Sequence, residues 1–120
     1  MRAGRAEEAA RLYRQVVEAN PRRPDAHNNL AVALKAAGKT RQAIESYRRA
    51  LKLDPTYATA RFNLARALRE VGDVDAALTQ FARLWEERPG DDRILGEIIE
   101  SLASAATWTS NVFQRRRYVC

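Results

Sequence analysis

The sequence predicts an all-α protein in which antiparallel helix pairs stack side by side into a solenoid. Two observations lead to this prediction: glycine and proline recur every 34 residues, and apolar residues within each copy follow a helical spacing. The recurring residues are Gly4, Gly38 and Gly72, with Pro21, Pro55 and Pro89. A fixed period of this size indicates stacked units, because one unit cannot bury its apolar face alone.

Three similar segments, each ending at one of these prolines, predict one helix each. In every segment an alanine is followed four residues later by an aromatic residue, so that both lie on one helix face. The pairs are Ala9 and Tyr13, Ala43 and Tyr47, and Ala77 and Phe81. The alanine lets two helices approach closely, and the ring fills the space beside it.

Three further helices alternate with these segments and begin near Pro24, Ala58 and Asp91. Their large aliphatic residues lie at i and i+4, which is an amphipathic helix period. The pairs are Leu30 and Leu34, Leu64 and Leu68, and Ile98 and Leu102. We expect a positive φ at Gly38 and Gly72 to end the first two helices, and the prolines to end the helices that precede them. The sequence therefore predicts six helices joined by short turns.

This arrangement resembles the tetratricopeptide repeat, whose pattern is W-x2-L-G-x2-Y…A-x3-F…P. The matching residues are Leu30, Ala31, Leu34, Ala43, Tyr47 and Pro55 in one unit, and Leu64, Ala65, Leu68, Ala77, Phe81 and Pro89 in the next. The resemblance covers about Gly4 to Ser104 and implies an α-solenoid of the tetratricopeptide type, which is a right-handed superhelix of antiparallel helix pairs. It departs from the pattern at the tryptophan position and at the small position of the last unit. The tryptophan position holds His27, Arg61 and Leu95, and the small position of the last unit holds Ile99.

The repeat array is expected over residues 1–106. It comprises a half unit (4–21), two full units (24–57 and 58–91) and the first helix of a further unit (92–105). Residues 107–120 break the pattern, because Asn111 stands 34 residues after Ala77, where a small apolar residue is needed. This aromatic and basic tail is either a divergent capping helix or a segment that docks on another copy.

The composition favours an intracellular binding protein. The 120 residues suffice for one domain, and the formal net charge of +6 with a pI near 10.1 favours acidic partners, although a genomic arginine bias would produce the same balance. The single cysteine, Cys120, suits a reducing compartment. No signal peptide or membrane span is recognisable, so we expect a cytoplasmic protein with no membrane partner.

The sequence predicts no enzyme, because the residue types that carry catalysis are scarce. There is one histidine, no second thiol or imidazole to complete a metal site, and no glycine-rich loop after a strand. We therefore expect no catalytic residue, metal or cofactor. His27 is interpreted as a helix-surface or packing residue.

The first helix of each unit should line the concave surface of such a solenoid. A helical wheel places the residues that could hold a peptide away from the apolar stripe, with the two asparagines Asn29 and Asn63 at its margin. The candidates are Asn28, Asn29, Val32, Lys35, Phe62, Asn63, Arg66, Arg69 and Arg93.

Asn29 and Asn63, one period apart, could bond successive peptide groups of an extended ligand. This resembles the asparagine ladder in the repeat arrays of peptide O-linked N-acetylglucosamine transferases. The alternative is that each amide ties one helix to its neighbour.

Lys35, Arg66 and Arg69 around Phe62 could bind carboxylates. Heat-shock co-chaperone repeats grip a terminal carboxylate similarly, and Asn63 and Arg93 match two clamp positions. Asn28, Val32 and Glu97 depart from that clamp.

The leading hypothesis is a non-catalytic scaffold that binds a protein or peptide segment in its concave groove. The alternative is self-assembly into a homo-oligomer through the bare first helix and the tail. Its candidate residues are Leu12, Val16, Trp108, Phe113 and Tyr118. Nucleic-acid binding is the least favoured class, because the arginines are spread over all helices and no recognition motif occurs.

Overall fold

The structure is a computed structural model that describes residues 2–104 of the chain. Five helices follow one another: α1 (Arg2–Ala19), α2 (Pro24–Ala36), α3 (Thr40–Leu53), α4 (Ala58–Glu70) and α5 (Val74–Glu87). Residues 92–104 are also helical. The predicted tail 107–120 lies outside the described residues.

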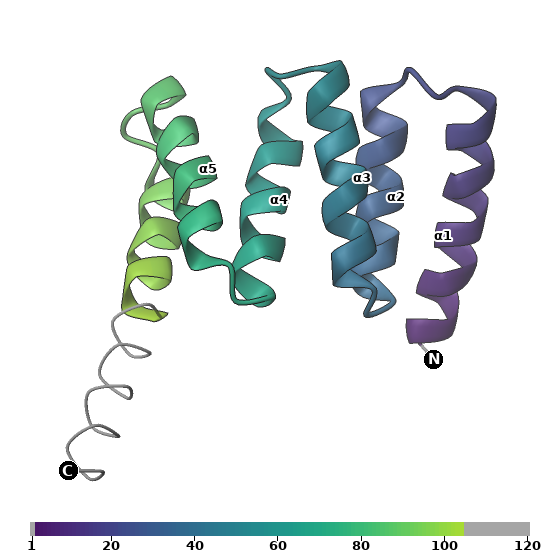
Figure 1. The fold of residues 1–120 in the computed structure, drawn as a ribbon, viewed down its shortest axis with the longest axis horizontal. Coiled ribbons are helices and arrows are strands. Elements are labelled where there is room, and N and C mark those ends of the chain that lie inside the picture. Colours follow the sequence, from purple (N-terminus) through teal and green to yellow (C-terminus); the bar gives the residue numbers. More distant parts are fainter. Residues whose placement is uncertain (1, 105–120) are drawn as a thin grey trace, which may run out of the picture.

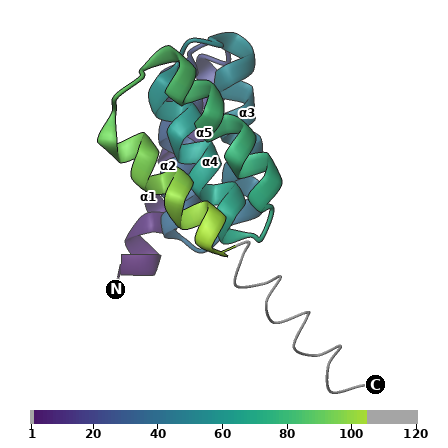
Figure 2. The same ribbon diagram turned by 90° about the vertical axis from the view of Figure 1, so that its left-hand side faces the viewer.

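The helices stand side by side in chain order, so the described part of the chain is an all-α solenoid (Figure 1). Figure 2, which looks along the row from the end that holds residues 92–104, shows α3 and α5 on the opposite side of the row from these residues. We call α2, α4 and residues 92–104 the first helices of their units, and α1, α3 and α5 the second helices.

The turns after α2 and α4 confirm the prediction for two glycines. Gly38 has φ of 83° and Gly72 has φ of 90°, which lie in the left-handed region that favours glycine. The N–H of Lys39 donates to the carbonyl oxygen of Leu34 at 2.8 Å, and the N–H of Asp73 donates to that of Leu68 at 2.9 Å. These bonds satisfy carbonyl groups that a helix end leaves free, and they reverse the chain sharply.

The alanine and aromatic positions form the core in the two full units, as predicted, whereas Tyr13 of the half unit is exposed. In the two full units Ala43 and Ala77 are completely buried, and so are Tyr47 and Phe81. Each alanine lies opposite a first helix that also carries a buried alanine, Ala31 or Ala65, in the contacting pairs α2–α3 and α4–α5. Small side chains on both helices let the backbones approach closely.

Polar residues hold the position where the repeat pattern has tryptophan. His27 and Arg61 are both buried, and each contacts the carbonyl oxygen of the proline six residues before it. Nε2 of His27 lies 2.8 Å from the oxygen of Pro21, and Nη2 of Arg61 donates to that of Pro55 at 2.9 Å. His27 and Arg61 therefore each tie a first helix to the turn that precedes it. Of the two roles considered for His27, helix surface or packing, its burial favours packing.

Candidate functional site

The first helices contact one another through polar side chains and form a continuous surface, which we call the first-helix surface. Asn28 on α2 is joined to Asn63 on α4, and Lys35 on α2 is joined to Glu70 on α4. Arg69 on α4 is joined to Glu97 in residues 92–104. The surface therefore spans all three first helices of the described chain.

The asparagines pair differently from the ladder that the wheel suggested. Nδ2 of Asn63 donates to Oδ1 of Asn28 at 3.4 Å, and Asn28 is buried, whereas Asn29 is exposed. The wheel treated α2 as a lone helix and placed Asn28 away from the core, but the neighbouring helices bury this residue. The Asn28–Asn63 bond thus ties one helix to its neighbour, which is the alternative that the sequence left open.

The predicted cations are paired with acidic residues of the next first helix. Nζ of Lys35 lies 3.0 Å from Oε1 of Glu70, and Nη1 of Arg69 lies 2.6 Å from Oε2 of Glu97. Arg66 lies more loosely beside the same carboxylate, with its Nε 3.7 Å from Oε1. These three cations are therefore largely compensated within the molecule, and do not form the free basic groove that the wheel suggested.

The sequence contains a signal for the contacts between α2 and α4 that one-helix reasoning missed. Asn28 and Asn63 are separated by 35 residues, one more than the repeat period, and Lys35 and Glu70 have the same separation. Two neighbouring helices in a repeat array meet with a constant offset. A search for complementary residues at that offset would have found both pairs.

A hollow of about 270 Å³ lies where α4 meets the start of residues 92–104. It brings together three predicted residues, Phe62, Asn63 and Arg93. The other residues that line it were not predicted as site residues, and they are Ala58, Thr59, Leu84, Arg88, Asp91 and Ile94. Two of these, Arg88 and Asp91, come from the turn between α5 and residues 92–104, whose course cannot be predicted from a helical wheel.

The hollow combines an apolar base with polar groups. Phe62 packs edge to face on the buried Phe81, with ring centroids 5.7 Å apart, so its ring is held in place. Leu84 and Ile94 are buried beneath. Asn63 supplies amide groups, while Arg88 and Arg93 supply guanidinium groups. An apolar base with a few convergent polar groups suits the side chain of a bound ligand.

Asp91 places a carboxylate among these cations. Its Oδ1 accepts from the N–H of Arg93 at 3.0 Å, and its Oδ2 lies 3.5 Å from Nη2 of Arg93. The backbone hydrogen bond from Arg93, together with the Arg93 side chain, lowers the pKa of Asp91, so this residue stays ionised. The pair fixes the first turn of residues 92–104 beside the hollow.

The two predicted residues on the exposed side of α2 extend the first-helix surface. Asn29 and Val32 are both exposed. Neither residue lines the hollow at Phe62.

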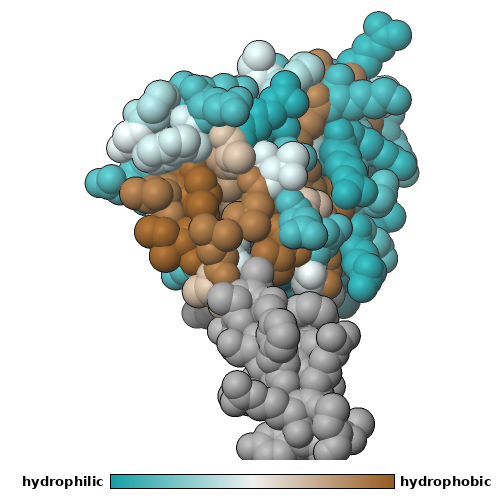
Figure 3. Space-filling model, turned by 60° about the vertical axis from the view of Figure 1, so that its left-hand side comes forward, coloured by the Kyte–Doolittle hydropathy of each residue, from teal (hydrophilic) through white to brown (hydrophobic). Residues whose placement is uncertain are grey.

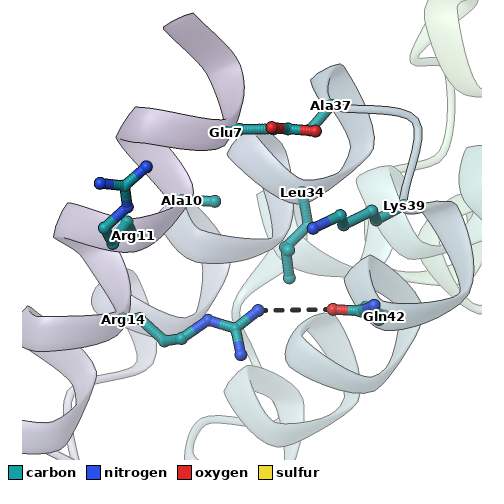
Figure 4. A pocket seen from close by; sticks show the side chains of 8 residues that line it. All are labelled: Glu7, Ala10, Arg11, Arg14, Leu34, Ala37, Lys39 and Gln42. Atoms are coloured by element: carbon teal, nitrogen blue, oxygen red, sulfur yellow. Dashed lines mark hydrogen bonds between the residues drawn. The ribbon is translucent and has the colours of Figure 1, made fainter. Parts of the chain in front are cut away.

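A second hollow of about 430 Å³ lies between α1 and the α2–α3 hairpin (Figure 4). Its charged residues are Glu7, Arg11, Arg14 and Lys39, and Nη2 of Arg14 donates to Oε1 of Gln42 at 3.4 Å across it. Ala10, Leu34 and Ala37 are its apolar residues. No sequence prediction placed a site here.

Other predicted features fall on α1 or outside the structure. Leu12 and Val16 are exposed on α1. Trp108, Phe113 and Tyr118 lie outside the described residues. Within residues 2–104, no group of three or more His, Cys, Asp or Glu side chains could hold a metal ion. No helix of the described part combines the length and apolar character needed to cross a membrane.

Comparisons with known proteins agree on the fold. Three solved structures are similar over most of their length and of this chain. The second TPR domain of human RPAP3, in complex with the HSP70 peptide SGPTIEEVD, has a TM-score of 0.75 at 22% identity and covers 82% of each chain. The first TPR of Spaghetti (RPAP3), bound to the HSP90 peptide SRMEEVD, has a TM-score of 0.78 at 22% identity and covers 86% of this chain and 84% of that one.

The Yersinia enterocolitica type III secretion chaperone SycD, in complex with a peptide of the translocator YopD, has a TM-score of 0.76 at 16% identity. It covers 85% of this chain and 83% of its own. No curated protein matches the chain. A tetratricopeptide repeat model matches residues 1–45 and 34–96, which is most of the sequence. The chain therefore belongs to the tetratricopeptide repeat family.

Proposed function

We propose that the protein is a non-catalytic scaffold that binds an extended peptide segment of a partner protein on its first-helix surface. The observation that carries this proposal is the hollow at Phe62, Asn63 and Arg93. Its volume of about 270 Å³ suits one large side chain of a ligand, while the amide of Asn63 can bond a peptide group of the ligand backbone. A cytoplasmic location is part of the proposal.

Three similar structures support the choice of a peptide as ligand. The two RPAP3 domains and SycD each hold a peptide, and all three share the fold of this chain. A solenoid presents a long surface with shallow hollows, which fits an extended segment better than a compact small molecule.

We expect a preference for an acidic partner to arise at one end of the surface. Lys35, Arg66 and Arg69 already face carboxylates of their neighbours, so a ligand would have to displace these ion pairs. Arg88 and Arg93 line the hollow itself, where a single carboxylate, Asp91, accompanies them. We therefore expect the acidic residue of the ligand to lie next to its apolar anchor, at this hollow.

Selection of peptides on the intact chain tests the proposal. A random nonapeptide library displayed on phage would be selected on the 120-residue chain, and the dissociation constants of the selected peptides measured by calorimetry. The double variant Asn63→Ala with Arg93→Ala should weaken binding at least about tenfold, because it removes polar contacts at the proposed anchor.

The second hollow provides a matched control. Gln42→Ala with Arg14→Ala also removes one amide and one arginine, so it changes the net charge equally, and it should leave the dissociation constant within about twofold. Circular dichroism must show that both double variants fold. The proposal is wrong if the library yields no binding peptide, if the two variants weaken binding equally, or if only the control variant does.

A further inference from the structure

Residues 92–104 expose an apolar face that the other first helices bury. Leu95, Ile99 and Leu102 form this face, which contributes to the apolar area at that end of the molecule in Figure 3. Leu102 is 52% exposed, whereas the residues one and two periods earlier, Leu68 and Leu34, are 3% and 2% exposed. Likewise, Ile99 is 57% exposed, whereas the residues one and two periods earlier, Ala65 and Ala31, are completely buried.

The contrast arises from which helices cover this face in each unit. In each full unit the second helix covers this face of the first helix, in the contacting pairs α2–α3 and α4–α5. No second helix covers residues 92–104 within the described part of the chain. The exposed face is therefore the place of a second helix.

At the other end, α1 exposes the face that second helices normally bury. Tyr13 is 37% exposed, whereas its equivalents Tyr47 and Phe81 are 1% and 0% exposed. Val16 is 38% exposed, and the equivalent Ala50 and Leu84 are buried. In α3 and α5 the first helix of the same unit covers these positions, and the described residues hold no such helix for α1.

The two exposed faces are complementary halves of one repeat unit. We propose that α1 of one copy packs on residues 92–104 of a second copy, head to tail, and so completes a unit across the junction. Tyr13 and Val16 would then take the places that Phe81 and Leu84 take against α4. Their charges also favour the contact, because α1 has four arginines against three glutamates, while residues 92–104 have three acidic residues and one arginine.

A second copy fits this face better than the chain's own continuation. One period after Ala77 and Phe81, which are completely buried, stand Asn111 and Arg115. A second helix formed in register from that segment would bury an amide and a guanidinium against Leu102 and Ile99, which is costly without partners. In α1 the same positions hold Ala9 and Tyr13, as the pattern requires.

The junction has two physical consequences. It joins unlike faces, so each copy keeps one free face, and association continues into rings or open chains rather than stopping at a dimer. Ile99 stands where Ala31 and Ala65 let helices approach closely, so the helices at the junction are held further apart than inside a unit. Because this contact is looser than one inside a unit, we expect the oligomer to dissociate on dilution.

The test is the molar mass of the full chain, measured by light scattering and sedimentation from about 1 µM to about 500 µM, a range that covers weak protein contacts. The wild-type mass should rise with concentration. Val16→Glu on α1 and Leu102→Glu in residues 92–104 should each stay monomeric, because a buried unpaired charge opposes the junction. Leu53→Glu is the matched control, because it introduces the same charge at an exposed leucine on α3 that lies outside the junction. It should associate like the wild type.

Mixing the two junction variants gives the sharpest result. An equimolar mixture of Val16→Glu and Leu102→Glu retains one intact face on each protein, so it should form a species of twice the monomer mass and nothing larger. Three results would overturn the proposal. One is a wild type that is monomeric at every concentration, another is a junction variant that associates alone, and the third is a mixture that stays monomeric.

A monomeric wild type whose melting temperature falls by several degrees in Leu102→Glu would indicate that residues 105–120 of the same chain cover the face. That result also counts against a second copy as the occupant.

Discussion

Nη1 of Arg69 on α4 lies 2.6 Å from Oε2 of Glu97, and thereby joins α4 to residues 92–104. This contact is an ion pair, and Oε2 of Glu97 is buried without a hydrogen-bond donor among the described residues. The same guanidinium nitrogen donates to the carbonyl oxygen of Glu97 and to Oγ of Ser101, each at 3.3 Å. Arg69 therefore holds the last described helix in place, in addition to lying on the first-helix surface.

Replacing Arg69 with alanine should lower the free energy of unfolding by roughly 2–3 kcal/mol, because Glu97 is mostly buried and would lose its closest cation. Urea unfolding measures this loss. Arg48→Ala removes an exposed pair with Glu45 and should change stability by less than about 0.5 kcal/mol. The double variant Arg69→Ala with Glu97→Ala should recover part of the loss. Equal effects of Arg69→Ala and Arg48→Ala would show that the pair does not hold the helix.

Two glycines should respond to alanine in opposite directions. Gly72 has a positive φ of 90°, so Gly72→Ala should destabilise the protein by about 1–2 kcal/mol even though the space around it is open. Gly96 lies inside helical residues 92–104, and a Cβ added there would meet nothing within 4 Å, so Gly96→Ala should stabilise by about 0.5–1 kcal/mol. Thermal unfolding of both variants checks the signs, and stabilisation by Gly72→Ala would contradict the turn geometry.

The fold could be predicted from the sequence because the same residue types recur at equivalent positions of each unit. Gly38, Ala43 and Tyr47 each act through their own backbone or through close contacts within one unit, and all three lie as predicted. The contacts between units were harder to predict. Asn28 is buried by neighbouring helices, and no single-helix pattern contains the offset that brings Asn63 to it.

The candidate site was predicted only in part for the same reason. Phe62, Asn63 and Arg93 lie around one hollow, because they occupy adjacent first helices. Arg88 and Asp91 reach that hollow from a turn, whose path depends on how α5 packs. Arg69 was predicted to bind a ligand carboxylate, and its pairing with Glu97 was missed because Glu97 lies on another helix.

Tyr47 should make stability depend on pH in alkaline solution. Burial, with Glu70 as a second cause, raises the pKa of Tyr47 from 10.0 to about 12. Between these values the unfolded chain loses the phenolic proton and the folded chain keeps it, so stability falls as the pH rises from about 10 to about 12. The expected loss between pH 9 and pH 11.5 is roughly 1–2 kcal/mol, because this range covers only part of the shift.

Urea unfolding of the wild type and Tyr47→Phe at pH 9 and pH 11.5 measures this loss of stability. The phenylalanine variant should lose less stability between the two pH values than the wild type, because it lacks the titrating group. Equal losses in the two proteins would mean that Tyr47 ionises alike in the folded and unfolded chains.

The peptide-binding proposal is tested most directly by mapping the contact of a selected peptide on the ¹⁵N-labelled chain by NMR. The account predicts that the largest amide shift changes fall on residues 59–63 and 91–94, around the hollow at Phe62 and Arg93. Shift changes concentrated at Glu7, Arg14 and Gln42, around the second hollow, would contradict it.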